Sequence, residues 1–188
     1  MAPTNAVTWQ IVGSQVYGST EAQMDHLRNF YDGKLQMQDD AASANDMLPN
    51  ADEDSFLAGD IASDNPLYLA GDIRANKNPS LLSLNTLFVR EHNHRADKLA
   101  QEHPDWSDDQ LYSAARSIVE YELQQITYNE WLPHLIGDAV SEDTGFDDNV
   151  SGETLVEFSI AGFRFGQTLL SSSIDLVGED ATDAGQSP

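Results

Sequence analysis

Two amphipathic helices, each with its own start and stop signals, can be read between Gly71 and Gly137. Asn78-Pro79 marks the start of the first helix, because proline at a first helical position loses no intrahelical hydrogen bond. Apolar side chains then recur at three- and four-residue steps and share one face: Leu81, Leu84, Leu87, Phe88 and Leu99. Pro104 ends this helix or its frayed tail.

The second helix begins at a capping box formed by Ser107 and Gln110, in which each side chain satisfies an orphan backbone N–H group. Its apolar stripe consists of Leu111, Ala115, Ile118, Val119, Leu123 and Ile126. Pro133 and Gly137 close it. Two long helices in the middle of the chain predict a mainly α fold.

The charge of the chain excludes two classes of partner. Acidic residues number 32 against 9 basic ones in 188 residues, which gives a formal net charge of −23. Nucleic acid and anionic membranes both require the opposite sign. This charge is typical of a solvated surface, and it also suits work in high salt or cation binding by a secreted protein. With no cysteine, the chain has no disulfide and no thiolate metal site.

The sequence predicts no contact with a membrane. No apolar run approaches the roughly 20 residues that a membrane-spanning helix needs. The first ten residues have neither a basic nor an apolar region of the kind found in secretory signals, so we predict no signal peptide here. The compartment stays open.

The rest of the chain divides by composition. Residues 1–70 are predicted to be loop-rich with one short helix over 20–32, and residues 71–137 hold the two core helices. An acidic loop over 138–151 leads to residues 152–170, which we expect to form a helix that is apolar on most sides and therefore buried. Residues 177–188 are polar and acidic, and they predict a disordered tail after a domain spanning 1–176.

The middle stretch resembles the animal-type haem peroxidases of the peroxidase–cyclooxygenase superfamily. The matching positions are Gly71, Asp72, Arg74, Leu84, Thr86, Leu87, Arg90, Glu91, His92, Asn93, Trp106, Asp108, Leu111, Ala115, Arg116, Ile118, Gln125, Ile126, Tyr128, Leu132, Pro133 and Gly137. So many matches in register are far more specific than one short motif. The resemblance covers most of this chain but only the middle part of the family's catalytic domain, and it implies a helical fragment of that domain.

The resemblance also implies roles for individual residues. Arg74 stands at the family's distal arginine, which stabilises charge as the peroxide bond breaks. Lys77 replaces a glutamate that forms an ester with haem in many members, and Gln167 replaces the axial histidine in the family's F-R-x-G-H-T signature. The family's distal histidine is expected upstream of Met1. His92, within the intact Arg90-Glu91-His92-Asn93 run, we interpret as a hydrogen-bonded structural residue beside a buried ion-pair network.

A calcium loop is implied near the N-terminus, where residues 14–19 resemble the family's calcium segment. Thr8 and Ser14 fall at the threonine and serine ligands, and Gln10 would offer a backbone carbonyl. Val12 replaces the aspartate, although calcium requires several charged oxygens. A degenerate loop is therefore the prediction.

Three functional hypotheses follow. The first is a haem enzyme that uses hydrogen peroxide to oxidise a small donor. The second is a truncated, non-catalytic helical module with a structural or interaction role, whose exposed apolar surface would favour self-association. The third is one piece of a split peroxidase, and Gln167 weighs against it because that change lies within this piece.

Overall fold

The computed structural model describes residues 8, 10–39, 46–51, 67–140, 145, 147–149, 152–169, 171 and 173, and the backbone of 174–177 and 183–187. The chain divides into two compact units. The larger unit is Gln10–Gly145, and the smaller one combines Met1–Trp9 with Phe146–Pro188. Each unit is described by itself.

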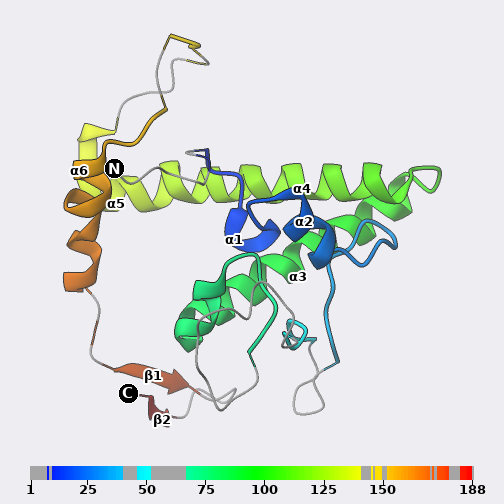
Figure 1. The fold of residues 1–188 in the computed structure, drawn as a ribbon, viewed down its shortest axis with the longest axis horizontal. Coiled ribbons are helices and arrows are strands. Elements are labelled where there is room, and N and C mark those ends of the chain that lie inside the picture. The colour runs from blue at the N-terminus through cyan, green and yellow to red at the C-terminus, as the bar shows by residue number, and fades with distance from the viewer. Residues whose placement is uncertain are drawn as a thin grey trace. The chain divides into compact units, whose positions relative to one another are not determined.

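The larger unit is helical, with two long helices, α3 and α4, at its centre (Figure 1). In chain order its elements are α1 (Ser14–Tyr17), α2 (Glu21–Leu27), the 3₁₀ helix η1 (Ile73–Lys77), α3 (Pro79–Glu102), α4 (Asp108–Gln125), the π-helical turn η2 (Ile126–Trp131), α5 (Leu132–Ile136) and the 3₁₀ turn η3 (Gly137–Ala139). The prediction of a mainly α fold is therefore confirmed.

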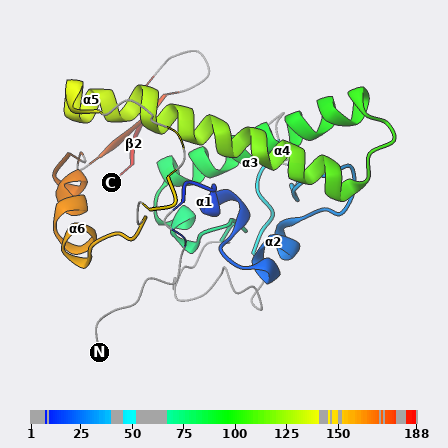
Figure 2. The ribbon, with the colours of Figure 1, turned by 90° about the horizontal axis from the view of Figure 1, so that it is seen from above.

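Helices α3 and α4 are joined by a short turn and pack against each other (Figure 2). Asn78 caps α3 by accepting the Leu81 N–H group at 2.9 Å, and Pro79 is its first residue. The Ser107 hydroxyl accepts the Gln110 N–H group at 3.3 Å, while the Gln110 side chain accepts the Ser107 N–H group at 2.8 Å. Both predicted helix starts are confirmed.

The buried face of α3 differs from the predicted one. The structure buries Asn85, Thr86, Val89, His92 and Ala96, and it exposes Leu81, Leu84 and Leu87. Helix α3 has two faces that could pack. Its contacts with α4, α1 and η1 bury the face that carries Val89, His92 and Ala96, and the leucine face stays exposed. On α4 the prediction holds better, since Leu111, Ala115 and Val119 are buried and only the end of the stripe, at Ile126, is exposed.

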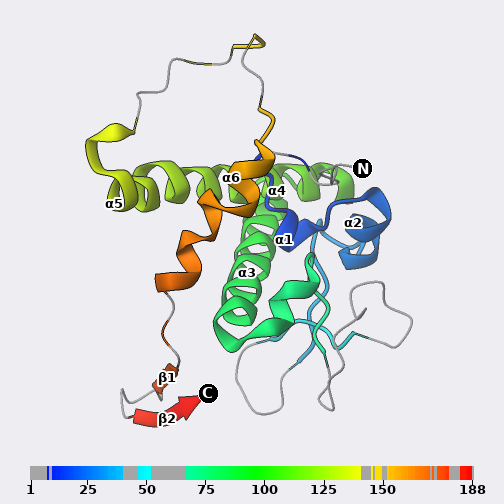
Figure 3. The same ribbon diagram turned by 60° about the vertical axis from the view of Figure 1, so that its left-hand side comes forward.

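The N-terminal part of the larger unit packs short elements onto these helices (Figure 3). Val16 and Tyr17 of α1, Leu27 of α2, and Leu35 and Leu48 from the loops join the same hydrophobic core. Isolated β-bridges pair residue 28 with 35, 38 with 47, and 50 with 68. The short helix predicted over 20–32 is α2, which ends at Leu27, and the turn-length α1 precedes it.

The smaller unit differs from its prediction in two respects. The segment expected to be one buried helix over 152–170 is α6 (Val156–Ile160) followed by the 3₁₀ helix η4 (Gly162–Leu169). Glycine costs about 1 kcal/mol in a helix interior, so Gly162 and Gly166 weaken a continuous α-helix. Its apolar side chains are exposed: Leu155, Phe158, Ile160, Phe163, Phe165 and Leu169.

The tail expected to be disordered over 177–188 contains backbone pairing. Strand β1 (Ile174–Val177) pairs antiparallel with β2 (Asp183–Ser187), with a register irregularity between Leu176 and Val177. The irregular-tail prediction therefore differs from the structure at these residues. Among the described residues, no helix combines the length and the apolarity that crossing a bilayer would require.

Candidate functional site

Arg74, the distal-arginine candidate, lies on η1, and a close backbone approach sets the entry to that helix. A Cβ atom on Gly71 would lie 2.6 Å from both the Gly18 amide nitrogen and the Ser14 carbonyl oxygen. Only glycine fits there, so the chain at Gly71 can pass directly against α1. Asp72 then caps η1 by accepting the Arg74 N–H group at 2.8 Å.

The guanidinium group of Arg74 is folded back onto its own helix cap. Its Nε atom lies 2.9 and 3.1 Å from the two Asp72 carboxylate oxygens, and its Nη2 atom lies 2.5 Å from Oδ2. This pairing lowers the pKa of Asp72 and raises the pKa of Arg74. The Arg74 side chain is 70% exposed, so the cation is accessible but already neutralised by its neighbour.

Lys77, at the haem-ester position, is exposed at the end of η1. Its charge helps to lower the pKa of Asp72. An amine has no carboxyl group to esterify, so this position cannot provide the covalent link that the resemblance implies. Arg74 and Lys77 therefore form a small exposed cationic edge around Asp72.

Gln167, at the axial-ligand position, is exposed on η4. It belongs to the smaller unit, whereas Arg74 and Lys77 belong to the larger one. Its neighbour Thr168 donates its hydroxyl to the Phe165 carbonyl at 2.6 Å, which tightens the turn. The residue that the resemblance assigns to the axial position is thus a neutral amide on a 3₁₀ helix.

The three calcium-loop candidates also fall in different units. Thr8 belongs to the smaller unit, and Gln10 and Ser14 belong to the larger one. The Gln10 carbonyl, expected as a ligand, accepts the Val12 N–H group at 3.1 Å. In the described part of the chain, no three His, Cys, Asp or Glu side chains gather as a metal ion would require. The calcium loop stays a prediction.

A buried polar cluster lies between α1, α3 and α4, and it centres on His92. His92 is 0% exposed, its Nδ1 atom lies 3.0 Å from the Tyr17 hydroxyl, and its Nε2 atom lies 2.9 Å from the Gly33 carbonyl. Tyr112 stands beside it, with ring centroids 5.3 Å apart. Burial lowers the pKa of His92 to about 4 and raises the pKa of Tyr17. The interpretation of His92 as a hydrogen-bonded structural histidine matches these contacts.

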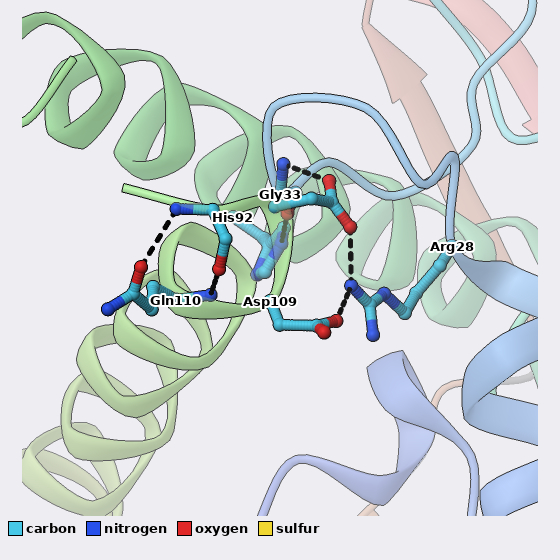
Figure 4. A network of polar contacts seen from close by, with 7 residues as sticks. Arg28, Gly33, His92, Asp109 and Gln110 are labelled. Carbon is cyan, nitrogen blue, oxygen red and sulfur yellow. Dashed lines mark hydrogen bonds and ion pairs between the residues drawn. The ribbon is translucent and has the colours of Figure 1, made fainter. Parts of the chain in front are cut away.

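Ion pairs hold the cluster in place (Figure 4). Arg28 contacts Asp108 at 2.5 Å and Asp109 at 2.7 Å, and it lies over the Tyr112 ring. Asp108 also accepts the Gly33 N–H group at 2.6 Å. The start of α4 therefore fixes the loop whose Gly33 carbonyl accepts the hydrogen bond from His92. Sequence reasoning missed this link, because acidic residues in the first turn of a helix are expected for their effect on the helix dipole alone, and nothing local points to partners 80 and 75 residues away.

The expected ion pairs around residues 90–93 are present but half-exposed. Glu91 pairs with Arg95 at 2.6 Å, and Arg95 also pairs with Glu122 of α4 at 2.5 Å. Arg90 donates to the Asp46 carbonyl instead. Asn93 bonds both backbone groups of Leu35, at 2.8 and 3.0 Å. These contacts attach the N-terminal loops to α3.

Comparison with known proteins identifies the fold. A sequence model described as "Animal haem peroxidase" matches residues 1–187. The chain belongs to the animal haem peroxidase family. It is 34% identical over 187 residues to a Caenorhabditis briggsae peroxidasin homolog. The aligned region covers 94% of this chain and 14% of that protein. It is 33% identical over 180 residues to Peroxinectin A of Dictyostelium discoideum, covering 95% of this chain and 33% of that protein.

A solved structure gives the same result in three dimensions. Peroxidase A from Dictyostelium discoideum superposes with a TM-score of 0.85 at 32% identity, covering 95% of this chain and 35% of that chain. The chain thus spans about a third or less of the length of each of these relatives. The resemblance read from residues 71–137 is confirmed at the level of the family.

Proposed function

We propose that this chain is a haem peroxidase-family protein in which peroxide-dependent oxidation of a small donor is weak or absent. Gln167 at the axial position carries the proposal. A proximal histidine holds haem iron through an imidazole nitrogen, whereas a glutamine amide is a neutral, hard oxygen donor that suits iron poorly. The donor set at this position therefore does not fit an iron-ligating site.

The geometry of Arg74 supports the same proposal. To stabilise negative charge on a peroxide oxygen, an arginine must direct free N–H groups at it. Here the N–H groups on Nε and Nη2 bind the two oxygens of Asp72, so the charge of the guanidinium is already offset by a carboxylate and two of its donors are engaged. Hydrogen peroxide and a small donor remain the partners that family membership implies, and the net charge of −23 still argues against nucleic acid.

Peroxide-dependent oxidation of a phenolic dye, with hemin supplied, tests this function. We expect the chain plus hemin to be no faster than hemin alone. The control is a pair of variants, Arg74→Ala and Lys77→Ala, which should both leave that rate unchanged. Faster turnover with the wild-type chain, lost in Arg74→Ala and kept in Lys77→Ala, would overturn the proposal and assign Arg74 a catalytic role.

A second candidate is a non-catalytic module with a structural or interaction role. The exposed row formed by Leu81, Leu84 and Leu87 on α3 favours it, because contiguous apolar surface marks a site of association. Further exposed apolar side chains lie on η2 and α5: Tyr128, Trp131, Leu135 and Ile136. We propose that such a module associates with itself through these surfaces.

A further inference from the structure

The hydrogen bond between Tyr17 and His92 has a fixed direction. The Gly33 carbonyl can only accept, so the His92 Nε2 atom, 2.9 Å away, must carry the hydrogen. The Nδ1 atom of a neutral imidazole then has a free lone pair, and the Tyr17 hydroxyl donates to it at 3.0 Å. Both side chains are 0% exposed. The fold thus presents a buried phenol to a preformed proton acceptor.

We propose that Tyr17 is a redox-active tyrosine whose one-electron oxidation is coupled to transfer of its phenolic proton to Nδ1 of His92. This site goes beyond the haem-dependent function proposed above, because none of its groups belongs to the distal or proximal positions. The oxidant it requires is a high-potential one-electron acceptor of the metal-complex or organic-radical class.

The step balances within the pair and the oxidant. Tyr17 gives one electron to the oxidant, its O–H bond breaks, and an N–H bond forms at His92 Nδ1. The products are a neutral phenoxyl radical, an imidazolium and the reduced oxidant. The imidazolium keeps its Nε2–H bond to Gly33 and donates Nδ1–H back to the Tyr17 oxygen, so one returning electron restores the starting pair.

The protonation states suit this step. Burial raises the pKa of Tyr17, so its phenol stays protonated and needs a base when it loses an electron. Burial holds His92 neutral at neutral pH, with a pKa of about 4, so Nδ1 is free to accept. Arg28 and Arg116 also lower the pKa of His92, and their charges disfavour the imidazolium. The pair is therefore a high-potential site rather than an easily oxidised one.

Tyr112 is a natural comparison within the same cluster. Its ring centroid lies 6.2 Å from that of Tyr17, and both rings are buried. The Tyr112 hydroxyl, however, has no hydrogen-bond acceptor among the described residues. The neighbouring Arg116 is a cation that donates hydrogen bonds and cannot take a proton. Oxidation of Tyr112 would leave its proton with no acceptor, so the geometry selects Tyr17.

Photochemical oxidation of the full chain without haem tests the proposal. A flash-generated ruthenium(III) polypyridyl complex serves as the oxidant, and electron paramagnetic resonance follows the radicals. We expect a tyrosyl signal that outlasts those of the exposed Tyr31, Tyr121 and Tyr128, because solutes cannot reach Tyr17. This signal should be lost in Tyr17→Phe and kept in Tyr112→Phe. Persistence in Tyr17→Phe, or loss in Tyr112→Phe alone, overturns the assignment.

A measurement on the wild-type chain keeps the test decisive if Tyr17→Phe fails to fold. The chain is labelled with ¹⁵N-histidine, and electron–nuclear double resonance is recorded in light and heavy water. We expect a coupling to an exchangeable proton and to an imidazole nitrogen, as Nδ1–H bonded to the phenoxyl oxygen requires. A persistent tyrosyl radical with neither coupling contradicts the proposal. Because no haem is present, failed haem binding leaves this result unaffected.

Discussion

At the scale of single residues, folding changes the protonation of His92 in the acidic pH range. Its pKa falls from 6.5 to about 4 on folding, chiefly because burial disfavours the charged ring. Between these two values the unfolded chain binds more protons, so stability rises with pH through that window. A pKa shift of this size corresponds to about 3 kcal/mol in the free energy of unfolding. This contribution is present above pH 6.5 and is lost as the pH falls towards 4.

Histidine NMR and urea unfolding as a function of pH measure this directly. The His92 ring should stay neutral down to about pH 4, and the urea midpoint should fall as the pH drops below 6.5. His94→Gln, which alters an exposed histidine on the same helix, should keep the slope. A His92 ring that protonates near its ordinary pKa would contradict the buried geometry.

Two features of the structure require glycine at position 33: its backbone conformation and the close approach of neighbouring atoms. Its φ angle is +69°, and a Cβ atom there would lie 2.5 Å from the Tyr112 amide nitrogen. Gly33→Ala should therefore cost about 3 kcal/mol or more, since strain and a clash with the α4 backbone add. Gly145 has a φ of +84° and nothing within 4 Å, so Gly145→Ala should cost only the strain, about 1 kcal/mol. Equal losses in chemical denaturation would argue against the close approach.

The sequence predicted the kind of residue that His92 is, but not its partners. An intact polar run on a core-facing helix indicates a hydrogen-bonded histidine. Tyr17 and Gly33 lie 75 and 59 positions away, and no local pattern connects them to His92. Partners at such separations come from the packing of whole elements, so single-sequence reasoning could not name them.

At the scale of elements, the start of α4 depends on a local device. Ser107→Ala removes the hydroxyl that accepts the Gln110 N–H group. We expect a loss of about 1 kcal/mol in the free energy of unfolding, the usual cost of an N-cap. Ser113→Ala, at an exposed position within α4, should be neutral or slightly stabilising, because alanine favours a helix. Thermal or urea unfolding compares the two, and a larger loss for Ser113→Ala would refute the capping role.

Element boundaries were predictable because caps and prolines act within a few residues. Asn78-Pro79 and the Ser107–Gln110 pair placed both helix starts at the observed positions. The buried face of α3 was not predictable, since Leu81, Leu84 and Leu87 form as good an apolar row as Val89 and Ala96. The choice between these faces depends on which surfaces α4 and α1 offer.

At the scale of the whole molecule, the exposed row on α3 and the net charge act in opposite directions. Electrostatic repulsion at a formal charge of −23 keeps copies of the chain apart at low salt. At physiological ionic strength the Debye length is about 8 Å, so repulsion over longer distances is largely screened. Sedimentation velocity should therefore show more self-association as salt increases. Leu84→Asp should reduce it, and Ser83→Asp, which adds the same charge beside the row, should have little effect. Equal effects of the two variants would exclude the leucine row as the interface.

Family membership was readable from sequence at this scale, whereas activity was not. Matches in register from Gly71 to Gly137 identified the family, and the fold agrees with a solved Dictyostelium peroxidase at a TM-score of 0.85. Lys77 and Gln167, at the positions to which the resemblance assigns the haem ester and the axial ligand, depart from the family pattern. The fold persists through such changes because helix packing does not depend on them.

Hemin titration of the purified chain, followed by absorbance in moderate and high salt, tests the central claim most directly. With glutamine at the axial position, the spectrum of the wild-type chain should stay that of free hemin. Gln167→His should sharpen and shift the Soret band, whereas Gln101→His, which adds a histidine at an exposed site on α3, should not. A sharp Soret band with one-to-one saturation in the wild-type chain, unchanged in Gln167→Ala, would contradict the account.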